Sequence, residues 1–191
     1  IMKFIQKVNM ASETVNSYMR SGILTAEDVP VTINSGDFLI VKGLLNNEVL
    51  EYFGQETKDF NKFEMRLPAT ADVTAENITV YVADPVNVSS GEIMGVTYRD
   101  GVKTLGVTVP ADEPSSLRKL VADDMFYLGE DNFVSTPTVG KFAVLTNNDA
   151  RLTPAAADSA TGLCIAIEDS KPFVEGIDVT ATGYLCRVVH F

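Results

Sequence analysis

The residue types most able to do chemistry are few in this chain. There is one histidine, His190, and there are two cysteines, Cys164 and Cys186. A catalytic histidine must lie beside the nucleophile that it activates, and no serine or cysteine motif accompanies His190. We therefore expect His190 to be an ordinary packing or surface residue at the end of a strand. No catalytic residue is assigned, and an enzyme is the least favoured class.

The two cysteines lack the short paired spacings of a zinc site and are too few to staple a small domain with disulfides. Each lies in a segment with a strand pattern, so Cys164 and Cys186 approach each other only if those strands are neighbours. Buried free thiols are the favoured state, because cysteine often serves as a small core residue. The glycines form no phosphate-binding cluster, so neither a metal site nor a cofactor is predicted.

Acidic residues are the other candidates for chemistry. The pairs Asp123-Asp124 and Glu130-Asp131 offer the oxygen ligands that calcium prefers, but they lack the alternate-position spacing of a calcium loop. We interpret them as solvated turn charges. Further aspartates lie beside expected turns, where a carboxylate accepts local backbone hydrogen bonds, and nothing pairs two of them as a glycosidase acid and base. These are Asp37, Asp84, Asp100 and Asp149.

An aromatic group surrounds the charged stretch 55–61. Such a group forms either an exposed binding patch or a set of core anchors, and core anchors are favoured because large aromatic side chains dominate core packing. Its members are Tyr52, Phe53, Phe60 and Phe63.

Composition limits the class of protein. The 191 residues carry a formal net charge of −11, with 46% hydrophobic and 21% charged residues. These proportions are typical of a folded globular protein of about one domain. The negative charge repels phosphates, so no direct contact with nucleic acid is expected. No apolar run approaches the ~20 residues of a membrane helix, and the first residues lack the pattern of a secretory signal.

The elements that position these residues are expected to be strands, except near the start. Residues 1–30 show no clean period and are predicted to form an N-terminal arm, with a short helix over 11–20 as one option. Such an arm packs either on its own domain or on a neighbouring subunit. Residues 31–191 are predicted to form one β-rich domain, with 68–114 as a candidate second small β-lobe.

Two hairpins and one helix are predicted within that domain. The turn 34–37 joins the strands 31–33 and 38–41, and a strand with one apolar face follows at 78–83. The Asp-Gly turn within 94–109 indicates the strongest hairpin. Leu117, Leu120 and Val121 have helical spacing and predict a short helix over 117–121.

The rest of the chain is read as strands separated by turns and by the alanine-rich loop 153–161. Many short strands with almost no helix predict an all-β, mainly antiparallel fold, either a β-sandwich or a partly open β-barrel with one or two short helices. The strands of this part are expected at 125–128, 141–145, 163–167 and 184–189.

Three segments, 34–41, 139–154 and 162–167, together follow one pattern. The pattern is a Gly-Asp pair, an apolar strand, a turn, a loop of small residues and a glycine before a further strand, and its glycine positions are Gly36-Asp37 and Gly162. It resembles the pattern of the head decoration, or capsid cement, proteins of tailed bacteriophages.

The resemblance implies a structural protein on the outer surface of the virion capsid. Such proteins are often trimeric, bind the expanded head and bridge major capsid protein subunits, without catalysis or cofactor. Two alternatives remain open: a β-rich adhesion or glycan-binding module displayed on a virion, and another virion component such as a tail-tube protein.

Overall fold

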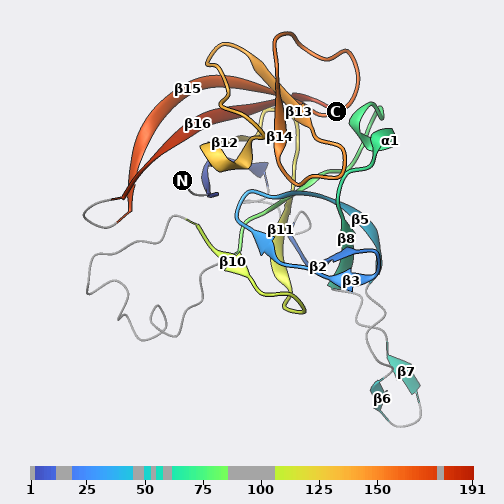
Figure 1. Cartoon of the computed structure of the whole chain (residues 1–191). Coiled ribbons are helices and arrows are strands. Elements are labelled where there is room, and N and C mark those ends of the chain that lie inside the picture. Colours follow the sequence, from blue (N-terminus) through green and yellow to red (C-terminus); the bar gives the residue numbers. More distant parts are fainter. Residues whose placement is uncertain are drawn as a thin grey trace.

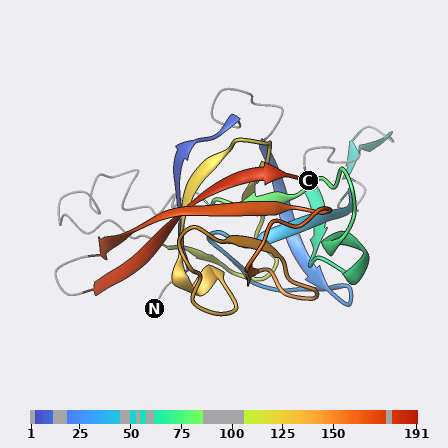
Figure 2. The ribbon, with the colours of Figure 1, turned by 90° about the horizontal axis from the view of Figure 1, so that it is seen from above.

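The structure is a computed structural model, and it describes residues 3–11, 19–44, 50–52, 55–57, 62–85, 106–175 and 179–191. Nearly all of its regular structure is strand, as the sequence predicts. Short strands with alternating apolar residues dominate because each can bury one face against a neighbouring layer. Figures 1 and 2 show two main bodies of strand, a barrel and an open sheet that packs beside it.

Five strands form a closed barrel. Their order is β11-β9-β5-β8-β2, and β11 also pairs with β2, which closes the ring. The pair β2–β8 is parallel and the other pairs are antiparallel. A closed ring leaves none of its strand edges unpaired along its length. The barrel strands are β2 (Met19–Ala26), β5 (Phe38–Leu44), β8 (Lys62–Arg66), β9 (Tyr81–Ala83) and β11 (Ser115–Lys119).

Six antiparallel strands form the open sheet, in the order β1-β12-β16-β15-β13-β14. Most of it comes from the C-terminal third of the chain, and β1 joins it from the other end. Its strands are β1 (Ile5–Asn9), β12 (Met125–Gly129), β13 (Phe142–Leu145), β14 (Leu152–Ala155), β15 (Cys164–Glu175) and β16 (Val179–His190).

Smaller elements complete the described fold. β3 extends the barrel along β2, β4 pairs with β10, and β6 pairs with β7. The helices of the described residues are α1 (Thr70–Val73) and one 3-10 turn (Glu130–Asn132). The small strands are β3 (Val29–Pro30), β4 (Ile33–Asn34), β6 (Leu50–Tyr52), β7 (Gln55–Thr57) and β10 (Thr108–Val109).

The barrel and the open sheet share a wall made of β5 and β9. Side chains alternate between the two faces of a strand. Phe38 and Val82 therefore point into the core under the open sheet, whereas Leu39 and Tyr81 belong to the core of the barrel. The sequence predicted one apolar face for 78–83, but both faces are buried over residues 80–83. Because each body covers one face of this wall, the two cores form one continuous fold.

The described parts of the N-terminal segment 1–30 pack on their own domain. They form β1 on the open sheet and β2 in the barrel. Side-chain bonds also fasten them: Asn132 Oδ1 accepts a hydrogen bond from Phe4 N at 3.0 Å, and Asp124 Oδ1 accepts one from Ala11 N at 2.7 Å. These residues are integral to the two sheets. The short helix predicted over 11–20 does not reach residues 19–20, which begin β2, and 12–18 lie outside the described residues.

The helix predicted over 117–121 is wrong, because Ser115–Lys119 is strand β11. Three apolar residues at helical spacing are a weak signal over so short a segment. Here the segment has a strand on each side, β9 and β2, and both offer backbone hydrogen bonds. Leu117 points into the barrel, and Arg118 is buried beside Asp84, so β11 buries both of its faces.

The turn at 34–37 is present, but it does not make the predicted hairpin. Asp37 N donates to Asn34 O at 3.1 Å, and Gly36 has the positive φ of 77° that such a turn needs. The strands on either side then separate, because β4 pairs with β10 while β5 enters the barrel. Of the second predicted hairpin, 94–109, only 106–109 lie within the described residues, and β10 there pairs with β4. The described parts of the candidate lobe 68–114 include β9, a strand of the barrel.

Each of the four strands predicted after residue 120 is present. Those at 125–128 and 141–145 have nearly the predicted bounds, as β12 and β13. Those at 163–167 and 184–189 belong to β15 and β16, which are far longer and pair with each other along their whole length. The start of the loop predicted at 153–161 is taken by β14.

Candidate functional site

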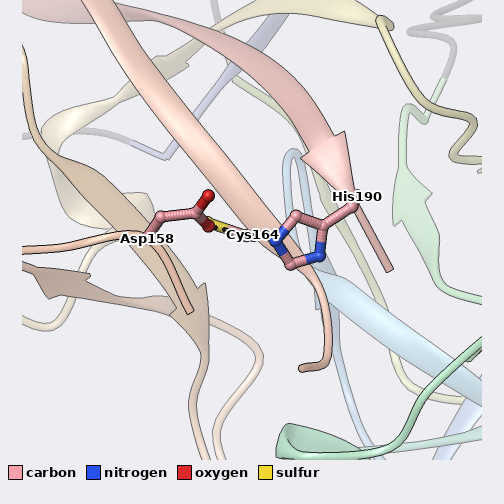
Figure 3. A group of neighbouring side chains, drawn as sticks. All are labelled: Asp158, Cys164 and His190. Atoms are coloured by element: carbon pink, nitrogen blue, oxygen red, sulfur yellow. Dashed lines mark hydrogen bonds and ion pairs between the residues drawn. The ribbon is translucent and has the colours of Figure 1, made fainter. Parts of the chain in front are cut away.

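Three side chains with metal-binding or nucleophilic chemistry meet at one end of the open sheet (Figure 3). Cys164 opens β15 and His190 closes β16, and the two residues are opposite each other in the antiparallel register. Asp158 reaches them from the loop between β14 and β15. Its Oδ1 lies 3.0 Å from Nε2 of His190, and the possible ligand atoms of the three residues all lie within 4.8 Å of one another.

The electrostatics of this cluster keep the cysteine protonated. Burial, and then a hydrogen bond to Asp158, raise the pKa of the Cys164 thiol to about 11. Asp158 interacts with both the thiol and His190, and these contacts lower the pKa of its carboxyl. Asp158 is exposed, His190 is half-buried and Cys164 is buried, so the cluster opens to solvent on its aspartate side.

An arrangement with Asp158 bonded to both the Cys164 thiol and the His190 imidazole is poorly suited to nucleophilic catalysis. An active cysteine needs a depressed pKa and a base that takes its proton, which is usually an imidazole. Here the carboxylate is the hydrogen-bond partner of both the thiol and the imidazole, and the thiol pKa is raised. The cluster does offer one sulfur, one nitrogen and one oxygen ligand, a set that metal ions of borderline softness accept.

The two cysteines are free and buried, which confirms the favoured prediction. Their strands are neighbours, but Cys164 is opposite His190 and Cys186 is opposite Ile167. Cys186 is completely buried in the core between the open sheet and the barrel, and this burial raises the pKa of its thiol. Of the two cysteines, only Cys164 belongs to a group of three possible metal ligands among the described residues.

The acidic pairs are used locally. Asp124 is buried and accepts backbone N–H bonds from Ala11 and Val121, yet burial still raises the pKa of its carboxyl. Its neighbour Asp123 is exposed, 3.5 Å from Arg187. Glu130 accepts a hydrogen bond from the Thr136 hydroxyl at 2.7 Å. The interpretation as a solvated turn charge is therefore wrong for Asp124, which is buried, and agrees with the exposed Asp123.

The turn aspartates also have separate partners. Asp37 accepts from Asn34 N and pairs with Lys3 at 2.6 Å. Asp84 pairs with the buried Arg118. Asp149 and Arg151 pair with each other, which lowers the pKa of Asp149. Asp100 lies outside the described residues.

Of the aromatic group, Phe63 is the member whose side chain is described. It is half-buried, packs against the barrel core and lies under the guanidinium of Arg20, 5.8 Å from its ring centre. This placement agrees with a core anchor. Phe53 and Phe60 lie outside the described residues, and only the backbone of Tyr52 is described.

A second feature stands out on the open sheet, where β15 and β16 run past their other partners (Figures 1 and 2). β12 pairs with β16 as far as Gly183, and β13 pairs with β15 as far as Ala166. Beyond these points, residues 172–175 and 179–182 pair only with each other among the described strands. We call this two-stranded extension the ribbon.

The base of the ribbon is fixed to the body by an aromatic cluster. Phe173 packs against Phe4 and Tyr127, with ring centres 5.0 and 5.2 Å apart, and Lys171 Nζ lies 4.1 Å from the centre of the Tyr127 ring. Gly183 makes room for this packing, because a Cβ there would lie 2.3 Å from Phe173. The ribbon therefore leaves the sheet in a defined direction.

Comparison with known proteins identifies no relative, since no family model, curated protein or solved structure matches this chain. The candidate features therefore have to be interpreted from their own geometry.

Sequence reasoning missed both features. It treated Cys164 and His190 separately and did not consider Asp158. A hairpin centred midway between Glu175 and Val179 would have placed Cys164 opposite His190, since both are equally far from that centre. The polar run 168–171 and Pro172 concealed this hairpin, because they interrupt the apolar pattern by which strands are recognised.

Proposed function

We propose that this protein is a structural component of a virus particle. It binds the outer surface of a tailed-phage capsid and stabilises the expanded head by bridging major capsid protein subunits. The observation that carries this proposal is the ribbon, a projecting pair of strands on a body that is otherwise closed or layered.

A two-stranded ribbon is marginally stable in water and exposes unpaired backbone N–H and C=O groups along its outer edges. Such edges accept an added strand from another chain, with backbone hydrogen bonds that supply affinity. An assembly protein gains from this arrangement, because binding completes the sheet. A rigid body behind the ribbon fixes the direction in which the partner is held.

The two edges of the ribbon are unequal. The β15 edge carries Pro172, which has no N–H to donate, next to the exposed Lys171, and both residue types protect strand edges from pairing. The β16 edge, 179–182, reads Val-Thr-Ala-Thr and has neither proline nor charge. We therefore assign the β16 edge as the one that pairs with a capsid subunit.

The segments that resemble capsid cement proteins adjoin one another in the fold, which supports a common structural unit. Segment 139–154 contains β13 and β14, and 162–167 begins β15, the neighbour of β13. Segment 34–41 reaches them through a hydrogen bond of 2.8 Å from Phe38 N to Ala150 O. The net charge of −11 suits an exterior position away from packaged nucleic acid.

Bridging several capsid subunits requires several contacts on one binder. A homotrimer presents three ribbons, and linked contacts raise the overall affinity well above that of one ribbon. We therefore propose a trimer as the binding form.

The test is light scattering of the purified chain, followed by co-sedimentation with expanded and unexpanded heads of the phage that encodes it. We expect a trimer that pellets with expanded heads only. A matched variant replaces 174–180 with Asn-Gly, a two-residue hairpin turn. It keeps Phe173 and also Ala181, which is buried in the same cluster as Phe173, so it should fold and lose the binding.

A monomer that pellets with neither kind of head would contradict the proposal. Retained binding by the shortened variant would instead reject the ribbon as the contact. Glycan binding by a monomer would favour the alternative of an adhesion or glycan-binding module displayed on a virion.

A further inference from the structure

The Asp158, Cys164 and His190 cluster has no part in the contact proposed above. We infer that it is a binding site for a divalent transition-metal ion of the zinc class. The three groups come from one loop and two strand ends, and their possible ligand atoms already lie within 4.8 Å of one another (Figure 3).

The ligand types select the class of metal. Sulfur and imidazole nitrogen favour zinc, cobalt and similar ions, whereas calcium and magnesium prefer sites made of oxygen alone. Zinc accepts cysteine, histidine and carboxylate ligands together. With three protein ligands, a fourth position remains for water or for a group from a partner. It faces solvent, because the side chain of Asp158 is 51% exposed.

The geometry requires only small movements. Zinc bonds of about 2.0–2.3 Å in a tetrahedral site place neighbouring ligand atoms about 3.3–3.8 Å apart. The contact of 3.0 Å between Asp158 Oδ1 and His190 Nε2 must open slightly, and the longest separation, at most 4.8 Å, must close by about 1 Å. Rotation of the exposed Asp158 side chain can open its contact with His190.

The backbone around all three ligands is fixed by hydrogen bonds, in the strands β15 and β16 and in the Asp158 loop. Cys164 and His190 are paired residues of adjacent strands, so their separation is set by the sheet. The loop of Asp158 is closed by a hydrogen bond of 2.7 Å from the Ser159 hydroxyl to Thr161 O. It returns to β15 through Gly162, whose φ is 78° and whose Cα faces the Val73 carbonyl too closely for any side chain. A metal would staple this loop to the end of β16.

The test uses Co²⁺ as the probe, with the full chain, free of any histidine tag and treated first with a chelator. A cobalt–thiolate bond gives a sulfur-to-metal charge-transfer absorption in the near ultraviolet, which reports ligation by cysteine directly. We expect this band to appear at one Co²⁺ per chain and to disappear when Zn²⁺ is added.

Variants assign the ligands. Cys164→Ser should abolish the band, and Asp158→Asn and His190→Gln should each weaken Co²⁺ binding at least tenfold. Cys186→Ala is the matched control, since it removes the other buried cysteine and should leave the band unchanged. Asp158 is exposed, so its variant should fold even if a change at the buried Cys164 does not.

Two results would overturn the inference. One is a folded chain that gives no thiolate band at millimolar Co²⁺. The other is a band that survives in Cys164→Ser or is lost in Cys186→Ala. Because this assay needs no capsid, its outcome is independent of the proposed assembly function.

Discussion

The barrel and the open sheet differ in how the backbone groups of their edge strands are paired. Each must satisfy the backbone groups of its outermost strands, and the barrel does so by closing through the β11–β2 pair. The open sheet keeps two edges, at β1 and β14, and sends the ribbon beyond the body. A closed barrel gives a rigid core but few places for another chain to add a strand. Both candidate features lie on the open sheet, as this difference leads one to expect.

The largest effect is expected from a substitution that leaves a cavity in the wall shared by the barrel and the open sheet. It tests whether the two bodies unfold together. Phe38 is fully buried and packs against Phe126 of the open sheet, with ring centres 6.4 Å apart. We expect Phe38→Ala to lower the free energy of unfolding by about 4 kcal/mol. Urea unfolding followed by two spectroscopic probes should show one transition. Two separate transitions would show that barrel and sheet fold independently.

A smaller effect is expected at the base of the ribbon. In Gly183→Ala the new Cβ meets the ring of Phe173 at 2.3 Å, so the ring must shift, at a cost of about 1–2 kcal/mol. Gly43→Ala in the barrel strand β5 is the matched control. Nothing lies within 4 Å of its Cβ, and its effect should stay within about 0.5 kcal/mol. Equal effects in urea unfolding would mean that Phe173 does not fix the ribbon.

The smallest effect on the free energy of unfolding is expected at Asp72 in α1. Asp72 accepts a hydrogen bond from Ala69 N at 2.7 Å and one from Arg66 at 3.0 Å, and the pair with Arg66 lowers the pKa of its carboxyl. Its stabilising contribution is therefore present above the unfolded pKa, near 3.8, and disappears as pH falls through the folded value. We expect Asp72→Asn to cost about 1 kcal/mol at pH 7.

The pH dependence supplies the check on this variant. Its difference from the original chain in urea unfolding should be full at neutral pH and should shrink as pH falls below the unfolded pKa of 3.8. Asp28→Asn is the comparison, because Lys42 also lowers the pKa of Asp28, but this pair is exposed and is screened by solvent. Its effect on the free energy of unfolding should therefore be smaller than that of Asp72→Asn. A difference that does not vary with pH would contradict the assigned role of the Asp72 charge.

Local pattern predicted the strands whose environment is simple. β12 and β13 alternate or run apolar between clear turns, and their positions were predicted closely. The pattern failed where tertiary partners decided the structure. Residues 117–119 belong to a strand because β9 and β2 flank them. The described parts of segment 1–30 join both bodies, although this segment has no period of its own.

The candidate sites depend on register, which composition does not reveal. Cys164 and His190 are far apart in the chain and meet only because β15 and β16 pair along their full length. Asp158 joins them through a loop whose course depends on a left-handed glycine, Gly162. The ribbon was missed for a related reason, since exposed polar strands carry little of the alternation by which strands are predicted.

The most direct test of the proposed assembly role is amide hydrogen exchange of the chain, measured free and bound to expanded heads. In the free chain, the amides of 179–182 should exchange quickly, because β16 has no outer partner there among the described strands. Binding should slow them strongly and leave the barrel amides unchanged. Ribbon amides that exchange equally fast in both states, with protection appearing elsewhere, would contradict the account.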